Sequence, residues 1–320
     1  MEIYKTQSQI AAKHNWLLSL VVLVLITFGA LALTQGIALV IIPFLFNISY
    51  EDILPLFTGE LEHPNGRMAM LFLQGLGGGL AFFLAGWLFS HIVEKASLGW
   101  KHQFARVKFT YLLLLIPLLF GFVLFDAKVI EWNMNVEFPP FMEGFETFAR
   151  EMEDQAMKMT MFLTDFQTLG EFLAGVLVIG VLAGIGEEYF FRGILQPKLH
   201  RYFGNAHAGV WLAAFVFSAI HFQFYGFFPR LLLGALFGYL YLYSGSLIYP
   251  IVGHVLNNTF TIVMVYLNKL GMVEFNIEDP EGVNWYTVLL GLMVFIACMR
   301  LFVQQGNKNK TLHGEVAEGF

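Results

Sequence analysis

The chain has 320 residues, of which 57% are apolar and only 13% are charged, and its mean hydropathy is +0.65. A soluble domain carries about 25% charged residues, so this composition excludes one and indicates an all-α, polytopic membrane protein. The net charge of −6, without a basic stripe, argues against a nucleic-acid partner. The single cysteine, Cys298, allows neither an intramolecular disulfide nor a thiolate cluster for a metal.

Eight stretches are apolar enough to cross a bilayer as helices, although the sixth is short. They cover residues 16–46, 68–93, 108–126, 169–199, 206–224, 230–243, 247–267 and 285–303. The first is far longer than the ~7–15-residue apolar core of a signal peptide, so we expect no cleaved leader. Lysine and arginine concentrate in the segments that would be internal if the N-terminus is cytoplasmic. We therefore expect about eight transmembrane helices, both termini in the cytoplasm, and a location in the cell (inner) membrane.

A single membrane domain is expected over residues 16–303, between a cytoplasmic N-terminal segment (1–15) and a polar cytoplasmic tail (304–320). Its outer connection, 127–168, carries apolar residues at spacings of three and four, as on one face of a helix. These are Phe145, Phe148, Met152, Ala156, Met159 and Leu163. The pattern favours a helix that lies in the interface or caps the bundle. Two more specific alternatives are a lid that covers the site and a methionine-lined surface that binds a metal ion.

Two adjacent acids and a base lie inside the fourth span, where ionisable groups are costly and mark a partner or a function. Glu188 and Arg192 are four residues apart and share a helix face, so we expect them to form an ion pair that sets the helix orientation. Glu187 points about 100° away around the helix and is the acid available for chemistry. The plainer alternative is a buried Glu187 neutralised by neighbouring polar groups.

Three more polar side chains belong to later spans. Glu187 precedes the turn near residue 204 by 17 residues and His221 follows it by 17, so the two come level in an antiparallel hairpin. His254 and Asn258 are four apart and project from one face of the seventh span. Each histidine alone would more often be an interhelical hydrogen-bonding group. Together they indicate a site in the inner half of the membrane.

This set of groups suits the hydrolysis of an amide by water. A carboxylate can take the proton of the water, and a histidine can hold the water. A second histidine with an asparagine can donate hydrogen bonds to the developing oxyanion, about 3–4 kcal/mol per donor. Glu187, His221 and His254 are also possible ligands of a catalytic zinc. No His-Glu-x-x-His stretch is present, however, so these ligands would come from separate helices and the cofactor stays open.

Three motifs follow one another on these spans: Glu-Glu-x-x-x-Arg, Phe-x-x-x-His and His-x-x-x-Asn. In this order they resemble the CPBP (ABI) family, which includes the type II CAAX prenyl endopeptidases and related bacterial intramembrane proteases. The resemblance covers about residues 165–270, the expected catalytic core, and implies an eight-helix membrane fold. It implies water activation by Glu187 with His221, an oxyanion hole of His254 and Asn258, and supporting roles for Glu188 and Arg192.

We therefore predict an intramembrane endopeptidase that cleaves near the cytoplasmic face, with CAAX-type C-terminal processing as one option. The expected partners are the lipid bilayer and a peptide or protein substrate, either prenylated or membrane-embedded. A proton- or ion-coupled transporter that uses the Glu/His cluster is an alternative, although no inverted repeat or pair of broken helices is visible. A non-catalytic immunity or scaffold protein of the same fold is another.

Overall fold

The computed structural model describes residues 15–58, 63–275 and 284–312, and over these ranges the chain is helical, without a β-strand. In chain order the elements are α1 (Trp16–Phe46), η3 (Tyr50–Asp52), α2 (Ile53–Thr58), α3 (Gly66–Gly75), η4 (Leu76–Leu80), α4 (Ala81–Leu88), η5 (Phe89–Val93), α5 (Trp100–Ala105), α6 (Phe109–Met134), η6 (Pro140–Met142), α7 (Glu143–Thr164), α8 (Leu169–Gly175), η7 (Val176–Leu182), α9 (Ala183–Phe190), η8 (Phe191–Leu195), α10 (Gln196–Phe203), α11 (Ala206–Ala219), α12 (Phe227–Ser244), α13 (Ile248–Lys269) and α14 (Trp285–Leu312).

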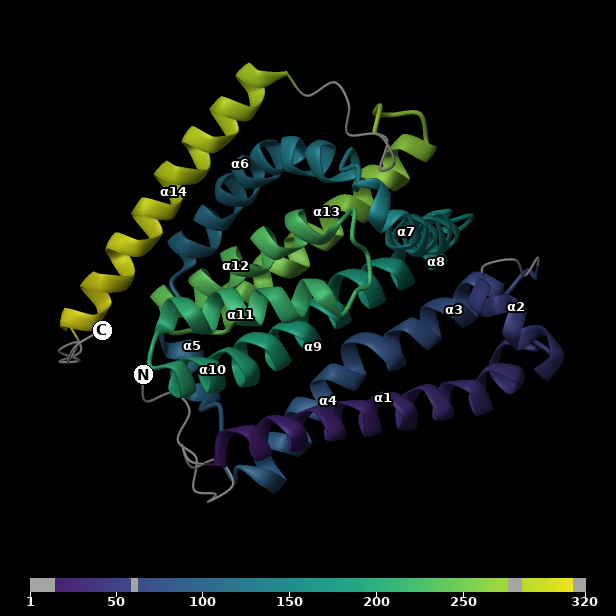
Figure 1. The fold of residues 1–320 in the computed structure, drawn as a ribbon, viewed down its shortest axis with the longest axis horizontal. Helices are drawn as coiled ribbons and strands as arrows, with labels where there is room; N and C mark the ends of the chain where they lie inside the picture. Colours follow the sequence, from purple (N-terminus) through teal and green to yellow (C-terminus); the bar gives the residue numbers. More distant parts are fainter. Residues whose placement is uncertain (1–14, 59–62, 276–283, 313–320) are drawn as a thin grey trace.

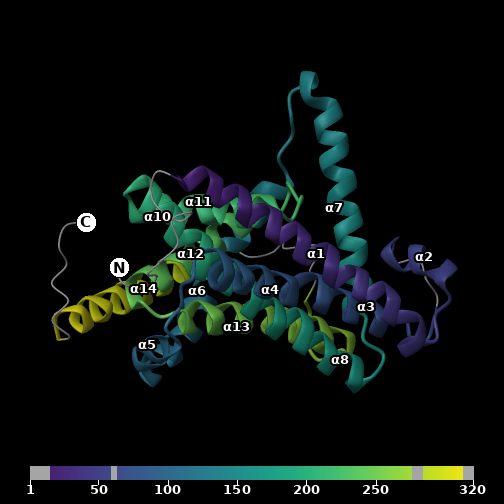
Figure 2. The same cartoon turned by 90° about the horizontal axis from the view of Figure 1, so that it is seen from below.

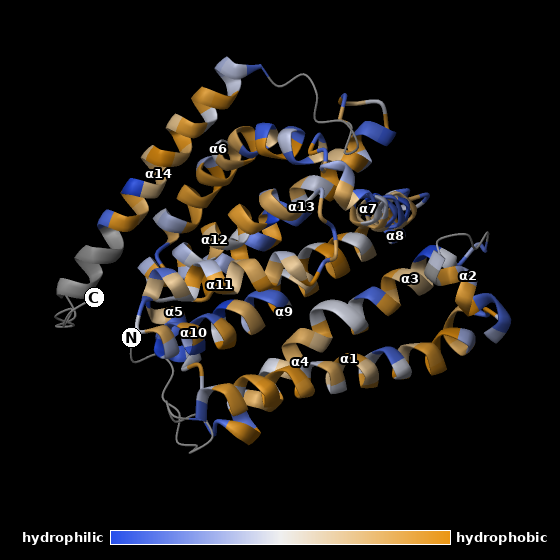
Figure 3. Ribbon diagram, viewed as in Figure 1, coloured by the Kyte–Doolittle hydropathy of each residue, from blue (hydrophilic) through white to orange (hydrophobic). Residues whose placement is uncertain are grey.

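Six helices of the described chain are long and apolar enough to span a membrane: Trp16–Phe46, Gly66–Val93, Phe109–Met134, Leu169–Phe203, Ile248–Lys269 and Trp285–Gln304. Ala206–Ala219 is a shorter apolar helix, and α12 has 18 residues. Figure 3 shows α1 and α14 apolar along most of the length drawn in colour, and many of their leucines are exposed, as contact with lipid requires. The predicted all-α polytopic bundle is confirmed, whereas the count of eight spans and the cytoplasmic termini stay predictions.

The helices pack side by side around the segment that carries the two adjacent acids (Figure 1). On one side α9 packs against α4, which in turn packs against α1. On the other side α9 packs against α13, and α13 contacts α12. The hairpin of α11 and α12 lies beside α10, and α6 with α14 closes that end of the molecule. Because α9 is central in this order, its polar side chains meet groups from several helices.

Two predicted boundaries are wrong. The third span was predicted to end at 126, but α6 continues to Met134, so the first part of the 127–168 connection belongs to that helix. The fifth span was predicted to reach 224, but α11 ends at Ala219 and a loop follows. In that loop Phe222 has φ 55, a left-handed conformation that is rare for a bulky residue and that ends the helix.

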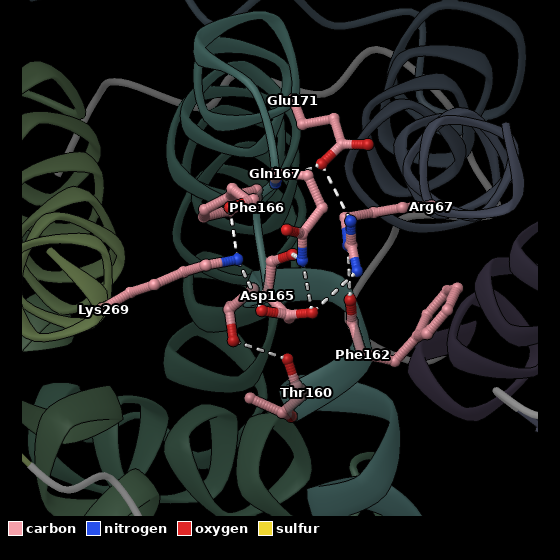
Figure 4. A network of polar contacts seen from close by, with 9 residues as sticks. Arg67, Thr160, Phe162, Asp165, Phe166, Gln167, Glu171 and Lys269 are labelled. Carbon is pink, nitrogen blue, oxygen red and sulfur yellow. Dashed lines mark hydrogen bonds and ion pairs between the residues drawn. The ribbon is translucent and has the colours of Figure 1, made fainter. Parts of the chain in front are cut away.

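Most of the rest of the 127–168 connection is the amphipathic helix α7, which stands out from the bundle (Figure 2). Its C-terminal end is fixed by a network that joins three elements (Figure 4). Arg67 of α3 bonds Glu171 of α8 at 2.8 Å and Asp165, which follows α7, at 3.2 Å. Lys269, at the end of α13, bonds Asp165 at 2.7 Å. The C-terminal end of α7 is therefore held by salt bridges to α3 on one side and to α13 on the other.

Two glycines set how closely the central helices approach. A Cβ added at Gly186 of α9 would lie 1.8 Å from the carbonyl oxygen of Gly79, in η4. A Cβ at Gly79 would lie 2.2 Å from the carbonyl oxygen of Leu182. Small residues at such crossings allow the backbones of membrane helices to pack in direct contact. This contact fixes the rotation and depth of α9 immediately before the two acids.

Candidate active site

The two adjacent acids lie on α9, which is flanked on both sides by π-helical turns, η7 and η8. Such wider turns are rare in α-helices and are frequent at functional sites. They shift the register of the side chains that follow, so the face on which a residue lies is set by the packed helix and not by a uniform 3.6-residue period. The site therefore depends on this locally irregular segment.

A buried network is centred on the carboxylate of Glu188. Arg192 Nη1 donates to Glu188 Oε1 at 2.6 Å, so the predicted ion pair is present, and the side chains of Glu188 and Arg192 are 0% and 1% exposed. The same oxygen lies 2.8 Å from Nδ1 of His254, on α13. Arg192 Nη2 donates to the carbonyl of Gly234 on α12 at 2.9 Å. Glu188 thus joins α9 to α13 and, through Arg192, to α12, a second role that spacing along one helix could not show.

Glu187 lies on a more open side of the same helix. Its side chain is 14% exposed, and its Oε2 is 3.8 Å from Nε2 of His254, beyond hydrogen-bonding distance but within ion-pairing range. His254 is therefore held between the two glutamates, with one ring nitrogen toward each. Because Glu188 fixes the Nδ1 edge of the ring, the Nε2 edge is directed toward Glu187.

His221 lies just beyond the end of α11. Its Nδ1 is 2.7 Å from the carbonyl oxygen of Phe217. A carbonyl can only accept, so Nδ1 carries the hydrogen and Nε2 of the neutral ring is a hydrogen-bond acceptor. Within the described chain no hydrogen bond or ion pair joins His221 to Glu187, and both instead interact electrostatically with His254. The two groups belong to one cluster but are not in direct contact.

Asn258 lies one turn beyond His254 on α13. Its Nδ2 donates to the carbonyl of Ile179, in η7, at 3.0 Å. Asn257 donates to its Oδ1 at 3.3 Å. A carboxamide has two N–H groups, so one such contact orients the amide and leaves the second hydrogen for another acceptor.

Aromatic rings surround the polar network. Phe237 stacks on His254 with ring centroids 5.0 Å apart, and Phe217 makes edge contacts with both His254 and His221, at 6.0 and 5.2 Å. The guanidinium of Arg192 lies over Phe217 at 4.7 Å. These contacts limit the water around the ion pair and strengthen its electrostatics. Phe217, the first residue of the Phe-x-x-x-His motif, thus contacts both histidines and the arginine of the site.

Arg230, on the first turn of α12, is a charged residue near the site that belongs to none of the three sequence motifs. It interacts electrostatically with Glu187, Glu153 and His221. Its Nη2 donates to Oε1 of Gln223 at 2.8 Å. The signal in the sequence is a single base at the start of the predicted sixth span, shortly after the His221 motif.

The proposed zinc ligands are not arranged as a zinc site. Among the residues that the structure describes, no group of three His, Cys, Asp or Glu side chains could hold a metal ion. Glu187 and His254 approach each other, but Nδ1 of His221 is engaged by the Phe217 carbonyl. A catalytic zinc requires about three protein ligands. The set Glu187, His221 and His254 therefore does not fit the metal, and the chemistry below uses the side chains alone.

Residues 169–260 match the Rce1-like family of type II CAAX prenyl endopeptidases. The resemblance to the CPBP family is confirmed over this segment, which is under a third of the chain and contains all three motifs. The Rce1-like match points to an integral membrane protein of the protease class.

One curated relative shares part of the chain. The Bacillus subtilis (strain 168) protein described as "Uncharacterized protein YpbD" is 29% identical over 83 residues, which make up 25% of this chain and 39% of that protein. The match spans well under two thirds of that relative, whose description assigns no activity. No solved structure matches the chain.

Proposed function

We propose that the chain is an intramembrane endopeptidase of the cell membrane that hydrolyses a peptide bond near the cytoplasmic face, with residues 165–270 as its catalytic core. The observation that carries the proposal is the arrangement of Glu187, His254 and Glu188. A partly exposed acid faces a histidine whose opposite edge is fixed by a second, fully buried acid. The Rce1-like match supports a substrate that ends in a CAAX-type tail.

Glu187 accepts a proton from water as the water oxygen attacks the carbonyl carbon of the scissile bond. His221 accepts a hydrogen bond from the same water at Nε2, because its Nδ1 hydrogen is committed to Phe217. The negative charge that forms on the carbonyl oxygen is stabilised by the second N–H of Asn258 and by His254. His254 donates from Nε2 as the imidazolium, with a hydrogen on each ring nitrogen, because its Nδ1 hydrogen is held by Glu188. Glu187 then returns its proton to the amine nitrogen as the carbon–nitrogen bond breaks.

Glu188 and Arg192 keep this arrangement in place. Glu188 orients the imidazole of His254, and Arg192 neutralises the carboxylate and ties it to α12. Neither needs to touch the substrate. Their charges stabilise the site because they are desolvated, paired and hydrogen-bonded.

The test is cleavage by the purified full-length chain in liposomes, with a mixture of peptides that end in apolar residues and mass spectrometry as the readout. Glu187→Gln should lower the rate by about 10²–10⁴-fold, the usual contribution of a general base, while the thermal stability stays near that of the wild type. Glu131→Gln, which removes an acid of α6 paired with Lys128, is the matched control. Full cleavage by Glu187→Gln would sink this mechanism. Proton flux that the same substitution abolishes, without any cleavage, would instead indicate a transporter.

A further inference from the structure

The connection between the long helices Gly66–Val93 and Phe109–Met134 carries basic and aromatic side chains on its exposed side. It contains α5, which stands at the edge of the bundle (Figure 2). Four of its residues are exposed and are called the α5 surface below: Lys95, Trp100, Lys101 and Phe104. The two rings are 38% and 61% exposed. Large rings with this exposure, next to two lysines, call for a partner that is both apolar and negatively charged.

The side chains of α5 itself divide between an outward and an inward side. Trp100 and Phe104 are one turn apart, and their ring centroids are separated by 6.3 Å. Lys101 follows Trp100 by one residue, so the three side chains fall within an arc of about 100° around the helix. Gln103 lies on another side, where it is 0% exposed. The rings and the charge therefore face outward together.

Contacts with the bundle hold the α5 surface in place. Gln103 Nε2 donates to the carbonyl of Leu98 at 2.9 Å, and its Oε1 accepts from the backbone N–H of Leu247, just before α13, at 2.6 Å. Trp100 stacks on Tyr189 of α9, with ring centroids 6.1 Å apart and an interplanar angle of 19°. Tyr189 is buried. The surface is therefore fixed to the helix that carries the two adjacent acids.

The backbone at Lys95 is in a left-handed conformation, with φ 49. Helices commonly end in this conformation, but glycine is the usual residue there because it has no Cβ. The turn is closed by the N–H groups of Glu94 and Ala96, which donate to the carbonyls of Phe89 at 3.0 Å and Ser90 at 2.9 Å. Strain of this kind accompanies functional sites. Here it holds a charged side chain outside the bundle.

The charges around α5 are complementary to an anion. Residues 63–125 contain one carboxylate, Glu94, which is buried and paired with Lys198 of α10. Residues 189–273 contain none. Exposed acids instead gather on α7, which lies on the opposite side of the molecule (Figure 1). Of the described residues packed around α5, no exposed carboxylate would repel a negatively charged partner.

The position of the α5 surface along the chain indicates which anion it meets. One membrane-spanning helix ends at Val93 and the next begins at Phe109, so the short connection between them lies where the chain leaves the hydrocarbon layer. Tryptophan is enriched at this depth of a bilayer, and lysines there attract the headgroups of anionic lipids. A membrane surface therefore satisfies both the rings and the charges.

We infer that the α5 surface binds anionic phospholipid of the adjacent leaflet, with Lys95 and Lys101 on the headgroups and the rings of Trp100 and Phe104 between the lipids. Because Trp100 is stacked on Tyr189, this contact also sets the depth of α9 relative to the membrane surface. Lipid binding of this kind goes beyond the proposed function and is independent of catalysis.

The experiment measures tryptophan fluorescence of the purified full-length chain in phosphatidylcholine liposomes that contain brominated phosphatidylglycerol or brominated phosphatidylcholine. Bromine quenches a nearby indole, and the difference between the wild type and Trp100→Phe isolates the signal of Trp100. Quenching of this signal should favour the anionic lipid by about 5- to 25-fold, which corresponds to one or two lysines at about 1 kcal/mol each. Salt at about 1 M should reduce the preference, because it screens exposed charges.

The lysines have their own variants. Lys101→Gln should lower the preference for the anionic lipid about five-fold, and Lys95→Gln combined with Lys101→Gln should bring it close to one. Lys158→Gln is the matched control, because it removes one exposed lysine from the acidic helix α7. Equal quenching by the two lipids in the wild type, or the same preference in Lys101→Gln and Lys158→Gln, would overturn the inference. Absence of quenching by either lipid would also overturn it, since Trp100 would then not reach the bilayer.

Discussion

Replacing Glu188 with glutamine should separate the structural acid from the catalytic one. In the wild type, Glu188 Oε1 lies 2.6 Å from Arg192 Nη1 and 2.8 Å from His254 Nδ1, and the three side chains are 0%, 1% and 4% exposed. The substitution keeps the size and one acceptor oxygen but removes the charge. Arg192 would then face only neutral acceptors, the Gly234 carbonyl and the glutamine amide oxygen, and the aromatic rings around it, without a paired negative charge.

The magnitude follows from the burial of the pair. Breaking a buried ion pair on one side costs about 3–5 kcal/mol, because the remaining charge has lost its partner. At about 2–4 °C per kcal/mol, Glu188→Gln should lower the melting temperature by roughly 6–20 °C. Adding Arg192→Met removes the orphaned charge and should recover part of this loss, as an apolar replacement of both partners often does.

The assay is thermal unfolding of the purified protein in detergent, alongside peptide cleavage, with Glu187→Gln as the matched variant one residue away. Glu187 is 14% exposed and makes no short contact with His254, so its substitution should move the melting temperature little and abolish cleavage. A melting temperature of Glu188→Gln within about 1 °C of the wild type would refute the reasoning. So would a failure of Arg192→Met to recover any stability in that background.

Three further predictions test other parts of the molecule. Asn258→Ala should lower kcat by about 10²–10³-fold with little change in KM, as expected for the loss of one oxyanion donor, measured by peptide cleavage. Gly186→Val should lower the melting temperature in detergent strongly, since its Cβ would lie 1.8 Å from the carbonyl oxygen of Gly79. Burial raises the pKa of Glu153 above its ordinary value of 4.5, so docked α7 binds more protons than free α7. Docking of α7 on the bundle should therefore weaken as the pH rises from about 4.5 through the raised pKa of Glu153. Spin labels on α7 and α11 would report this as a broader distribution of the distance between them.

Each of these has a control. Asn257→Ala removes the neighbouring amide, whose nitrogen donates to Oδ1 of Asn258, and should leave kcat within a few-fold. Gly29→Val adds a side chain where nothing lies within 4 Å of the new Cβ, so its melting temperature should equal that of the wild type. Glu153→Gln should remove the pH dependence of α7. Persistence of the dependence in that variant would contradict the assignment to Glu153.

The helix ends show where sequence patterns fail. Asp126 and the charged residues after it follow the predicted end of the third span, yet α6 continues to Met134 and Asp126 is 6% exposed. Helix formation depends on backbone hydrogen bonds and propensity, which a charged side chain does not interrupt. The apolar run through Phe224 suggested a longer fifth span, yet the helix ends at Ala219, because apolarity does not specify where a helix ends.

Spacing along the chain was enough to predict which side chains share a face within one helix. The spacing of Glu188 and Arg192 required a shared face, and 3.6 residues per turn made their ion pair predictable; the three motifs likewise identified the family matched over residues 169–260. Only the tertiary structure decided which helices meet. The contact of Glu188 with His254 joins residues 66 apart, and the position of Arg230 beside Glu187 depends on the packing of α12. The physical reason is that backbone geometry fixes the periodicity of one helix, whereas the depth and rotation of a helix against its neighbours are fixed by contacts such as Gly79 with Gly186.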